Sequence, residues 1–464
     1  MKKSKTIRTQ DLLYGINVVA LNIVALVGLS IILDKHGSQF ESLVPCMIIS
    51  LVVIVLELMA LFRVCEKQFN YFIIFVISFI IFHFGCFIVY AFGYKADYYY
   101  LLKYEPSTVL NTLKYQIVCT GSLFLSGTFF HSIKPFSFNR INMLDRLSIY
   151  KFSTVCFSIS AIITIPVTVQ KIYTYILGNY KAVIRLNESL PPALTFITYF
   201  FVPFCVLSYI YSEKKGTNRI FHSILIVYSF LVAMMGDRTV GLSGIITAVI
   251  IDTKYKNNKR SIKNIVGIII AGTIVSILTV FIRAVREGGT YQRMGAISIV
   301  AEILAEIGSS YFPLVLIMRV CPSVHPFLWG KSYFFSIISG FIPASLDFTG
   351  IVRTWNGFAV EPLKWIENDY DYNYGTGLSL CAEAYANFNW IGLIAIFIIG
   401  LILIKLLKEK TDNLFSQYSA TILLFEFFTL PRRNFYYIVN HSSYCIIWVS
   451  VIIFLFVKNK KKLT

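Results

Sequence analysis

Arginine is the residue whose spacing in this sequence most clearly suggests chemistry. The stretches MMGDRTVG, FIRAVREGG and TLPRRNFYY each place arginine, and no lysine, next to the end of an apolar run. A guanidinium group is planar and always charged, and its N–H fork matches two phosphate oxygens at once. The alternative for each arginine is a side chain that extends along apolar surface to water or pairs with a nearby carboxylate such as Asp237, Glu287 or Glu426. We predict an anionic head-group site formed by Arg238, Arg283, Arg286, Arg432 and Arg433, with Arg293 as a possible member.

Carboxylates near these arginines are candidates for proton transfer. Asp237 precedes the first arginine, and Glu383 lies about one turn before an apolar run. Glu302 and Glu306 are four residues apart among apolar neighbours, so they share one face of an amphipathic helix. Burial of a carboxylate raises its pKa toward the range that suits a general base. We predict Glu306, Glu383 and Asp237 as candidate catalytic residues and Glu302 as a possible one; partnership with the arginines is the alternative for all four.

Tyrosines mixed with Asp and Asn fill the segment NDYDYNYG. Aromatic rings stack on the C–H faces of sugars, and neighbouring polar groups bond sugar hydroxyls. The alternative is a belt of tyrosines at a membrane interface. The candidate sugar-binding residues are Tyr370, Tyr372, Tyr374 and Trp355.

Cysteine and histidine give no sign of a metal site. The nine cysteines and six histidines show no CxxC or CxxH spacing. We therefore predict no metal and no other cofactor. Among the histidines, His441 is a possible site residue, because it lies about two turns after Arg433.

The composition requires these residues to be positioned by a membrane-embedded scaffold. Hydrophobic residues make up 56% of the 464 residues and charged residues only 14%. Soluble domains carry about a quarter charged residues, so a soluble enzyme and a disordered chain are excluded. Apolar runs of this length also exclude a β-barrel, whose strands are short and alternating. The net charge of +18 is explained by the excess of basic residues in cytoplasmic loops, so no nucleic-acid partner is predicted.

Apolar runs of bilayer-spanning length predict twelve membrane spans. They cover residues 12–33, 43–62, 70–93, 111–131, 152–172, 193–212, 220–236, 239–252, 264–282, 388–404, 414–430 and 441–457. Two weaker stretches, 296–318 and 332–346, would raise the number to fourteen. With a cytoplasmic N-terminus, the short inner segments hold 25 of the 42 lysines and arginines, so both termini are predicted to be cytoplasmic.

The spans divide the chain into three parts. Residues 1–282 are predicted to form nine transmembrane helices, and residues 388–464 three more. Residues 283–387 would form a large outer loop with amphipathic or re-entrant helices. The predicted fold class is an all-α polytopic membrane protein with its arginines and carboxylates gathered on the outer side.

Several stretches of this sequence resemble the Wzy-type polymerases of O-antigen and capsular oligosaccharide repeat units. MMGDRTVGLSGIITAVIID resembles the glycine–arginine element of that family, and TLPRRNF resembles its arginine-bearing segment before the last span. RMGAISIVAEILAEIGSSYFPLVLIM and GTGLSLCAEAYANFNWIGLIAIFIIG look like two further family stretches. The match runs over roughly 230–440, and the first two hundred residues match only as generic spans. One departure is Asp237, because the family usually has glycine around the arginine.

The resemblance implies a GT-C-like glycosyltransferase of the bacterial inner membrane, with its active site on the periplasmic side. Donor and acceptor would both be undecaprenyl-pyrophosphate-linked oligosaccharides, and the growing glycan would move to the non-reducing end of a new unit. By this resemblance, Arg238, Arg283 and Arg432 or Arg433 would hold pyrophosphate, with Glu306 and Glu383 at the site. A separate partner protein would regulate chain length.

Two other functions would need similar residues. A lipid-linked oligosaccharide flippase carries charges deep in its spans, along a path. Here the charges collect on one side beside a long outer segment, which favours an enzyme. An O-antigen ligase, which moves finished polymer to another acceptor, is hardly distinguished by sequence alone.

Overall fold

A computed structural model describes residues 9–36, 40–65, 70–94, 103–136, 139–142, 144–177, 180–213, 215–235, 237–255, 296–343, 347–370, 377–410 and 412–457. Every regular element within these ranges is helical, which confirms the predicted all-α fold. Some predictions from the sequence fall outside the described residues. They are the span 264–282 and the site residues Arg283, Arg286, Arg293, Tyr372 and Tyr374.

The described part before residue 256 is a series of mostly long helices. They are α1 (Thr9–His36), α2 (Leu43–Val64), α3 (Tyr71–Ala91), α4 (Pro106–Ser126), α5 (Asn139–Asn142), α6 (Arg146–Leu177), α7 (Tyr180–Ser189), α8 (Pro192–Thr198), α9 (Phe201–Tyr211), α10 (Lys215–Met234) and α11 (Arg238–Tyr255). Short 3₁₀ turns η1 (Phe40–Ser42) and η3 (Gly127–Phe129) adjoin α2 and α4. The long helices follow from unbroken apolar runs, since backbone groups in a membrane must bond within their own helix.

The described part after residue 295 is built from shorter helices. They are α13 (Ala296–Ile307), α14 (Phe312–Val320), α15 (Lys331–Gly340), α16 (Ile351–Ala359), α17 (Glu361–Tyr370), α18 (Leu380–Phe388), α19 (Gly392–Leu407), α20 (Leu414–Phe427), α21 (Phe435–Ser442) and α22 (Val449–Phe456). Four single turns join them: η4 (Gly308–Tyr311), η6 (Asn389–Ile391), η7 (Leu430–Arg432) and the π-helical η8 (Ser443–Trp448). Gly308 and Pro313 lie where the weak predicted stretch 296–318 is divided into α13 and α14.

Nine helices or helix pairs among the described residues are long and apolar enough to cross a membrane. They are Thr9–Lys35, Leu43–Val64, Tyr71–Ala91, Arg146–Leu177, Pro192–Tyr211, Gly216–Met234, Val300–Val320, Leu380–Leu407 and Phe435–Phe456. The predicted number of twelve to fourteen is therefore not confirmed. The helices α4, α11 and α20 occupy predicted spans but are more polar or shorter, and α15 at the weak stretch 332–346 has only 10 residues.

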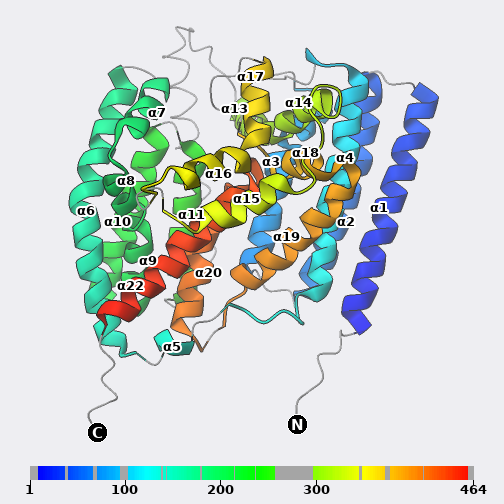
Figure 1. The fold of residues 1–464 in the computed structure, drawn as a ribbon. Helices are drawn as coiled ribbons and strands as arrows, with labels where there is room; N and C mark the ends of the chain where they lie inside the picture. The colour runs from blue at the N-terminus through cyan, green and yellow to red at the C-terminus, as the bar shows by residue number, and fades with distance from the viewer. Residues whose placement is uncertain are drawn as a thin grey trace.

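One helix forms the interior of the bundle and two others form its flanks. In its most apolar stretch, 72% of α3 is buried, against 17% for α1 and 28% for α6. Figure 1 shows α1 at one edge and α6 at the opposite edge, with α3 between them. Helix α3 also contacts α13, α20 and η7, so it joins the N-terminal helices to the C-terminal ones.

The described part of the predicted outer segment lies opposite the chain ends. Helix α1 starts and α22 ends at the same edge of the bundle, the lower one in Figure 1. Helices α13, α14 and α17 lie at the upper edge, whereas α15 and α16 cross the bundle obliquely (Figure 1). The start of α1 and the end of α22 thus lie at the opposite edge of the bundle from α14 and α17.

Reporter fusions should test the sidedness of this bundle. We expect fusions near residues 140 and 410 to report a cytoplasmic location, because these loops are basic and lie on the side of the termini. Fusions near residues 325 and 370 should report a periplasmic location. A cytoplasmic signal near 370 would contradict both the topology and the proposed side of the site.

Glycines allow the outer segment to contact α3 through its backbone. A Cβ atom at Gly308 would lie 2.3 Å from the backbone nitrogen of Cys86, and one at Gly85 would lie 2.5 Å from the Leu304 carbonyl oxygen. Only hydrogen atoms fit between backbones at this separation. The junction of α13 and η4 is therefore locked against the middle of α3.

Candidate functional site

The arginine pair lies in a tight turn between two helices of the C-terminal region. Helix α20 ends at Phe427, and the 3₁₀ turn η7 contains Pro431 and ends at Arg432. The Arg433 amide donates to the Leu430 carbonyl at 2.8 Å, and α21 begins two residues later. The predicted segment TLPRRNF thus forms a rigid turn, and its two arginines stand at the entrance to α21.

Arg433, which precedes α21, lies between an aspartate that precedes α11 and a tyrosine of α21. Its Nη2 atom is 3.9 Å from Oδ2 of Asp237, which directly precedes α11. Its guanidinium carbon is 5.3 Å from the centre of the Tyr437 ring, close enough for a cation–π contact. The Arg433 side chain is 41% exposed, so it stays accessible to an anion while these two contacts restrict its orientation.

A largely buried carboxylate of α20, Glu426, pairs with His441, which lies one turn after Tyr437 on α21. Nδ1 of His441 lies 2.8 Å from Oε2 of Glu426, and the Tyr437 hydroxyl donates to the same oxygen at 3.1 Å. Only 16% of the His441 side chain and 12% of the Glu426 side chain are exposed. In a neutral imidazole, an Nδ1 that donates to a carboxylate leaves Nε2 as a proton acceptor.

These side chains form one continuous stack, the Arg433–Tyr437–His441 stack. The Tyr437 and His441 rings are 3.8 Å apart and 28° from parallel. Tyr437 and His441 are four residues apart on one face of α21, and Arg433 lies just before the start of that helix. A cation and a proton acceptor are therefore held on the same surface, with a tyrosine ring between them.

Glycine and serine bring α11 close to α10 and to α20, the helix that carries Glu426. A Cβ at Gly241 would lie 2.6 Å from the Ser229 carbonyl oxygen, and one at Gly244 would lie 2.9 Å from the Phe425 ring. The Ser243 hydroxyl donates to the carbonyl of Phe425, which is the residue before Glu426. The glycines of the stretch DRTVGLSG are thus packing residues, which let α11 present Asp237 to Arg433.

Glu383 lies behind the turn rather than in an open site. It is fully buried on α18, and its Oε2 accepts the backbone N–H of Phe435 at 2.6 Å. Its Oε1 accepts the Ser332 hydroxyl of α15 at 2.8 Å. The structure thereby connects Glu383 to the arginine-bearing segment through the backbone of α21.

The other predicted site residues are more dispersed. Glu302 and Glu306 are half-buried on α13, which packs against α3 and η4. Trp355 lies on α16, and Tyr370 ends α17 with its ring 6.0 Å from the Arg319 guanidinium. Arg238 is the first residue of α11, but its side chain is outside the description. Of the predicted set, the structure brings together Asp237, Arg433 and His441, and joins Glu383 to them from behind.

Sequence reasoning did not assign a role to several residues of this site. Ser332 and Asn387 carry no signal in the sequence, Tyr437 is marked only as one of the tyrosines of NFYY, and Glu426 only as a possible arginine partner. A signal for part of the set was present, because Arg433, Tyr437 and His441 are spaced by four residues. The contacts between different helices, such as Glu383 with Phe435, have no comparable regular spacing in the sequence.

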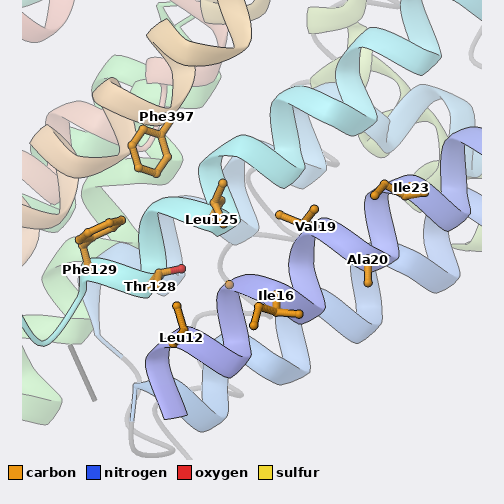
Figure 2. A pocket seen from close by; sticks show the side chains of 10 residues that line it. Leu12, Ile16, Val19, Ala20, Ile23, Leu125, Thr128, Phe129 and Phe397 are labelled. Carbon is orange, nitrogen blue, oxygen red and sulfur yellow. The ribbon is translucent and has the colours of Figure 1, made fainter. Parts of the chain in front are cut away.

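A separate groove lies on the outside of the bundle, away from these polar residues. It has a volume of about 470 Å³ and lies between α1, the end of α4 with η3, and α19 (Figure 2). Its lining residues are Leu12, Gly15, Ile16, Val19, Ala20, Ile23, Leu125, Thr128, Phe129 and Phe397. Almost all of this wall is hydrocarbon, so the groove suits a lipid chain and offers no catalytic group.

No three His, Cys, Asp or Glu side chains within the described residues are placed to hold a metal ion. The prediction that the chemistry needs no metal remains a prediction. The stack itself offers a cation for an anionic group and a nitrogen for a proton.

A comparison with protein families assigns nearly the whole chain. The family model described as O-antigen polysaccharide polymerase Wzy matches residues 16–462, nearly the whole chain. No curated protein and no solved structure matches the chain.

Proposed function

The chain belongs to the O-antigen polysaccharide polymerase Wzy family, and from this membership we propose that it joins undecaprenyl-pyrophosphate-linked oligosaccharide units in the outer leaflet of the bacterial inner membrane. The growing glycan leaves its lipid carrier and is transferred to the non-reducing end of a new lipid-linked unit. The nine candidate spans and the family agree with a multi-pass membrane polymerase. The GT-C-like arrangement, the periplasmic site and a chain-length regulator as partner belong to the same proposal.

The observation that carries this proposal is the Arg433–Tyr437–His441 stack. Glycosyl transfer from a pyrophosphate needs a cation beside the leaving group and a base beside the attacking hydroxyl. The anomeric carbon lies between these two groups, so cation and base must be separated by about the size of a sugar. A tyrosine ring separates Arg433 from His441, and this spacing supports the assignment.

The reaction then proceeds as a single displacement of pyrophosphate. The acceptor hydroxyl oxygen attacks the anomeric carbon of the donor, and its proton passes to Nε2 of His441. The bond between that carbon and the phosphate oxygen breaks, and undecaprenyl pyrophosphate leaves with the electron pair. Arg433 stabilises the charge that develops on the leaving group, and Glu426 stabilises the imidazolium.

The remaining predicted residues have supporting roles in this proposal. Arg238, Arg283, Arg286 and Arg432 would contribute further positive charge to the pyrophosphate site, with Arg293 as a possible addition. The aromatic residues Tyr370, Tyr372, Tyr374 and Trp355 would contact the glycan. Asp237 orients Arg433, and the face of α13 that carries Glu302 and Glu306 would border the substrate.

A deletion strain should distinguish this function from its alternatives. We expect its surface glycan to retain a single repeat unit and to lack the polymer ladder, with the ladder restored by the intact gene. Loss of every repeat unit would instead indicate a flippase or a ligase. Purified protein supplied only with the lipid-linked repeat unit should form polymer, which neither alternative would do.

A further inference from the structure

Glu383 of α18 is enclosed by the protein, where it meets α15 and α21. The side chain is fully buried, and each carboxylate oxygen already accepts a hydrogen bond from the protein. A general base must lie within hydrogen-bond distance of the proton that it removes. The surroundings of Glu383 therefore suit a structural ligand of the backbone better than a base.

The hydrogen bond from the Phe435 amide to Glu383 caps the start of α21. Phe435 is the first residue of this helix, and the first N–H groups of a helix have no partner within it. Such groups are usually satisfied by the side chain of the residue at the N-cap, but Asn434 makes no such bond here. The carboxylate of Glu383 takes its place from α18 and also complements the positive end of the helix dipole.

A second set of bonds fixes Glu383 itself. Asn387 lies one turn later on α18, and its Nδ2 donates to the Ser332 hydroxyl at 2.8 Å and to the Glu383 carbonyl at 2.9 Å. Its Oδ1 accepts the Gly330 amide at 3.1 Å. The Ser332 hydroxyl in turn donates its hydrogen bond to Glu383. Helices α15 and α18 are thereby tied together at the point where the carboxylate meets α21.

The loop before α18 also touches the arginine turn. Gly377 has a φ of +63°, and a Cβ atom there would lie 2.8 Å from the Arg432 carbonyl oxygen. Both the backbone of Arg432 and the amide of Phe435 are thus held by the same region. Arg433 lies between these two fixed points.

We propose that Glu383 is a positioning residue, which caps α21 from a neighbouring helix and thereby sets the place of Arg433, Tyr437 and His441. The inference rests on the proposed function for its effect on polymerisation, but the cap itself does not. Glutamine at this position keeps an oxygen for the Phe435 amide and an NH₂ group that can donate to Ser332. A base would be lost entirely in the same substitution.

The test compares Glu383→Gln and Glu383→Ala in the full-length purified protein. We expect Glu383→Gln to polymerise within about tenfold of wild type, since one hydrogen bond is weakened. Glu383→Ala should lose about a hundredfold per folded molecule and also bind undecaprenyl pyrophosphate more weakly. If Glu383→Gln is as inactive as Glu383→Ala while both bind undecaprenyl pyrophosphate normally, Glu383 is a base and the proposal is wrong.

Two serines on α15 supply a matched pair of variants. Ser332→Ala removes the hydroxyl that bonds Glu383 and should reproduce part of the alanine effect. Ser336 lies one turn later, is equally buried, and its hydroxyl has no hydrogen-bond partner among the described residues. Ser336→Ala should therefore leave polymerisation unchanged. Equal effects from both serines would indicate loss of packing rather than loss of the cap.

Hydrogen exchange separates this inference from the function on which it rests. The amides at the start of α21 should exchange faster in Glu383→Ala, but not in Glu383→Gln or Ser336→Ala. Unchanged exchange in Glu383→Ala would overturn the cap. If wild-type protein forms no polymer while the exchange result holds, the proposed function fails and the cap stands.

Discussion

Replacement of Arg433 by alanine is expected to lower the rate of polymerisation or the affinity for the lipid-linked donor ten- to a hundredfold. Loss of a bidentate, charge-assisted contact to phosphate costs about 1.5–3 kcal/mol, and about 1.4 kcal/mol corresponds to a factor of ten. Arg433→Lys keeps the charge but loses the fork, so it should recover only part of the activity. The measurement is a polymer-ladder assay, with the amount of membrane protein determined by blot.

Arg319 provides a control for Arg433. It lies on α14 and also contacts aromatic rings, with its guanidinium carbon 5.1 Å from the Tyr104 ring centre. Arg319→Ala should keep much more of the ladder than Arg433→Ala, because this arginine is not part of the stack and, among the described candidates for glycan binding, contacts only Tyr370. If lysine replaces Arg433 without loss, Arg433 acts only as an interfacial charge and the phosphate contact is refuted.

The second large effect is expected at His441. A positioned general base contributes typically about 10²- to 10⁴-fold, so His441→Ala should lower kcat by that order and leave KM for the donor nearly unchanged. Glu426→Gln should have a smaller effect, because it leaves the imidazole in place but removes the charge that stabilises its protonated form. Steady-state kinetics on purified protein would measure both.

The chain contains a matched control for this histidine as well. His325 also pairs with a carboxylate, since its Nε2 is 2.7 Å from Oδ2 of Asp369, and its ring stacks on Trp365 at 4.5 Å. It lies just before α15 and is not part of the stack, so His325→Ala should polymerise almost normally. If His325→Ala is the inactive variant and His441→Ala is not, the base has been assigned to the wrong pair.

Much of the scaffold was predictable because the membrane imposes simple rules on sequence. Long apolar runs gave α1, α2, α3, α6 and α19 close to their predicted positions. The number of spans was less predictable, because length and hydropathy do not show whether a helix is surrounded by lipid or by other helices. Helix α4 carries Thr112, Gln116 and Thr120, which are fully buried against other helices rather than exposed to lipid.

The candidate site was predictable in its residue types but not in its pairings. The arginines next to an apolar run identified the turn that contains Arg433. His441 was identified because it follows Arg433 by about two helical turns. The contacts of Arg433 with Asp237 and of Glu383 with Phe435 join segments 196 and 52 residues apart. Their partners depend on which helices are neighbours, and a single sequence does not contain that information.

The contact between Gly85 and Gly308 limits how such polymerases can be recombined. Helix α3 belongs to the N-terminal third of the chain. Its sequence is that of a generic membrane span, which could be expected to be exchangeable between relatives. Its backbone, however, meets the outer segment with no room for a methyl group at either glycine. A chimera that takes its first hundred residues from one relative and the remainder from another must therefore keep this glycine pair intact. The outer segment of this chain is in this way tied to a helix that touches no sugar in the proposed mechanism.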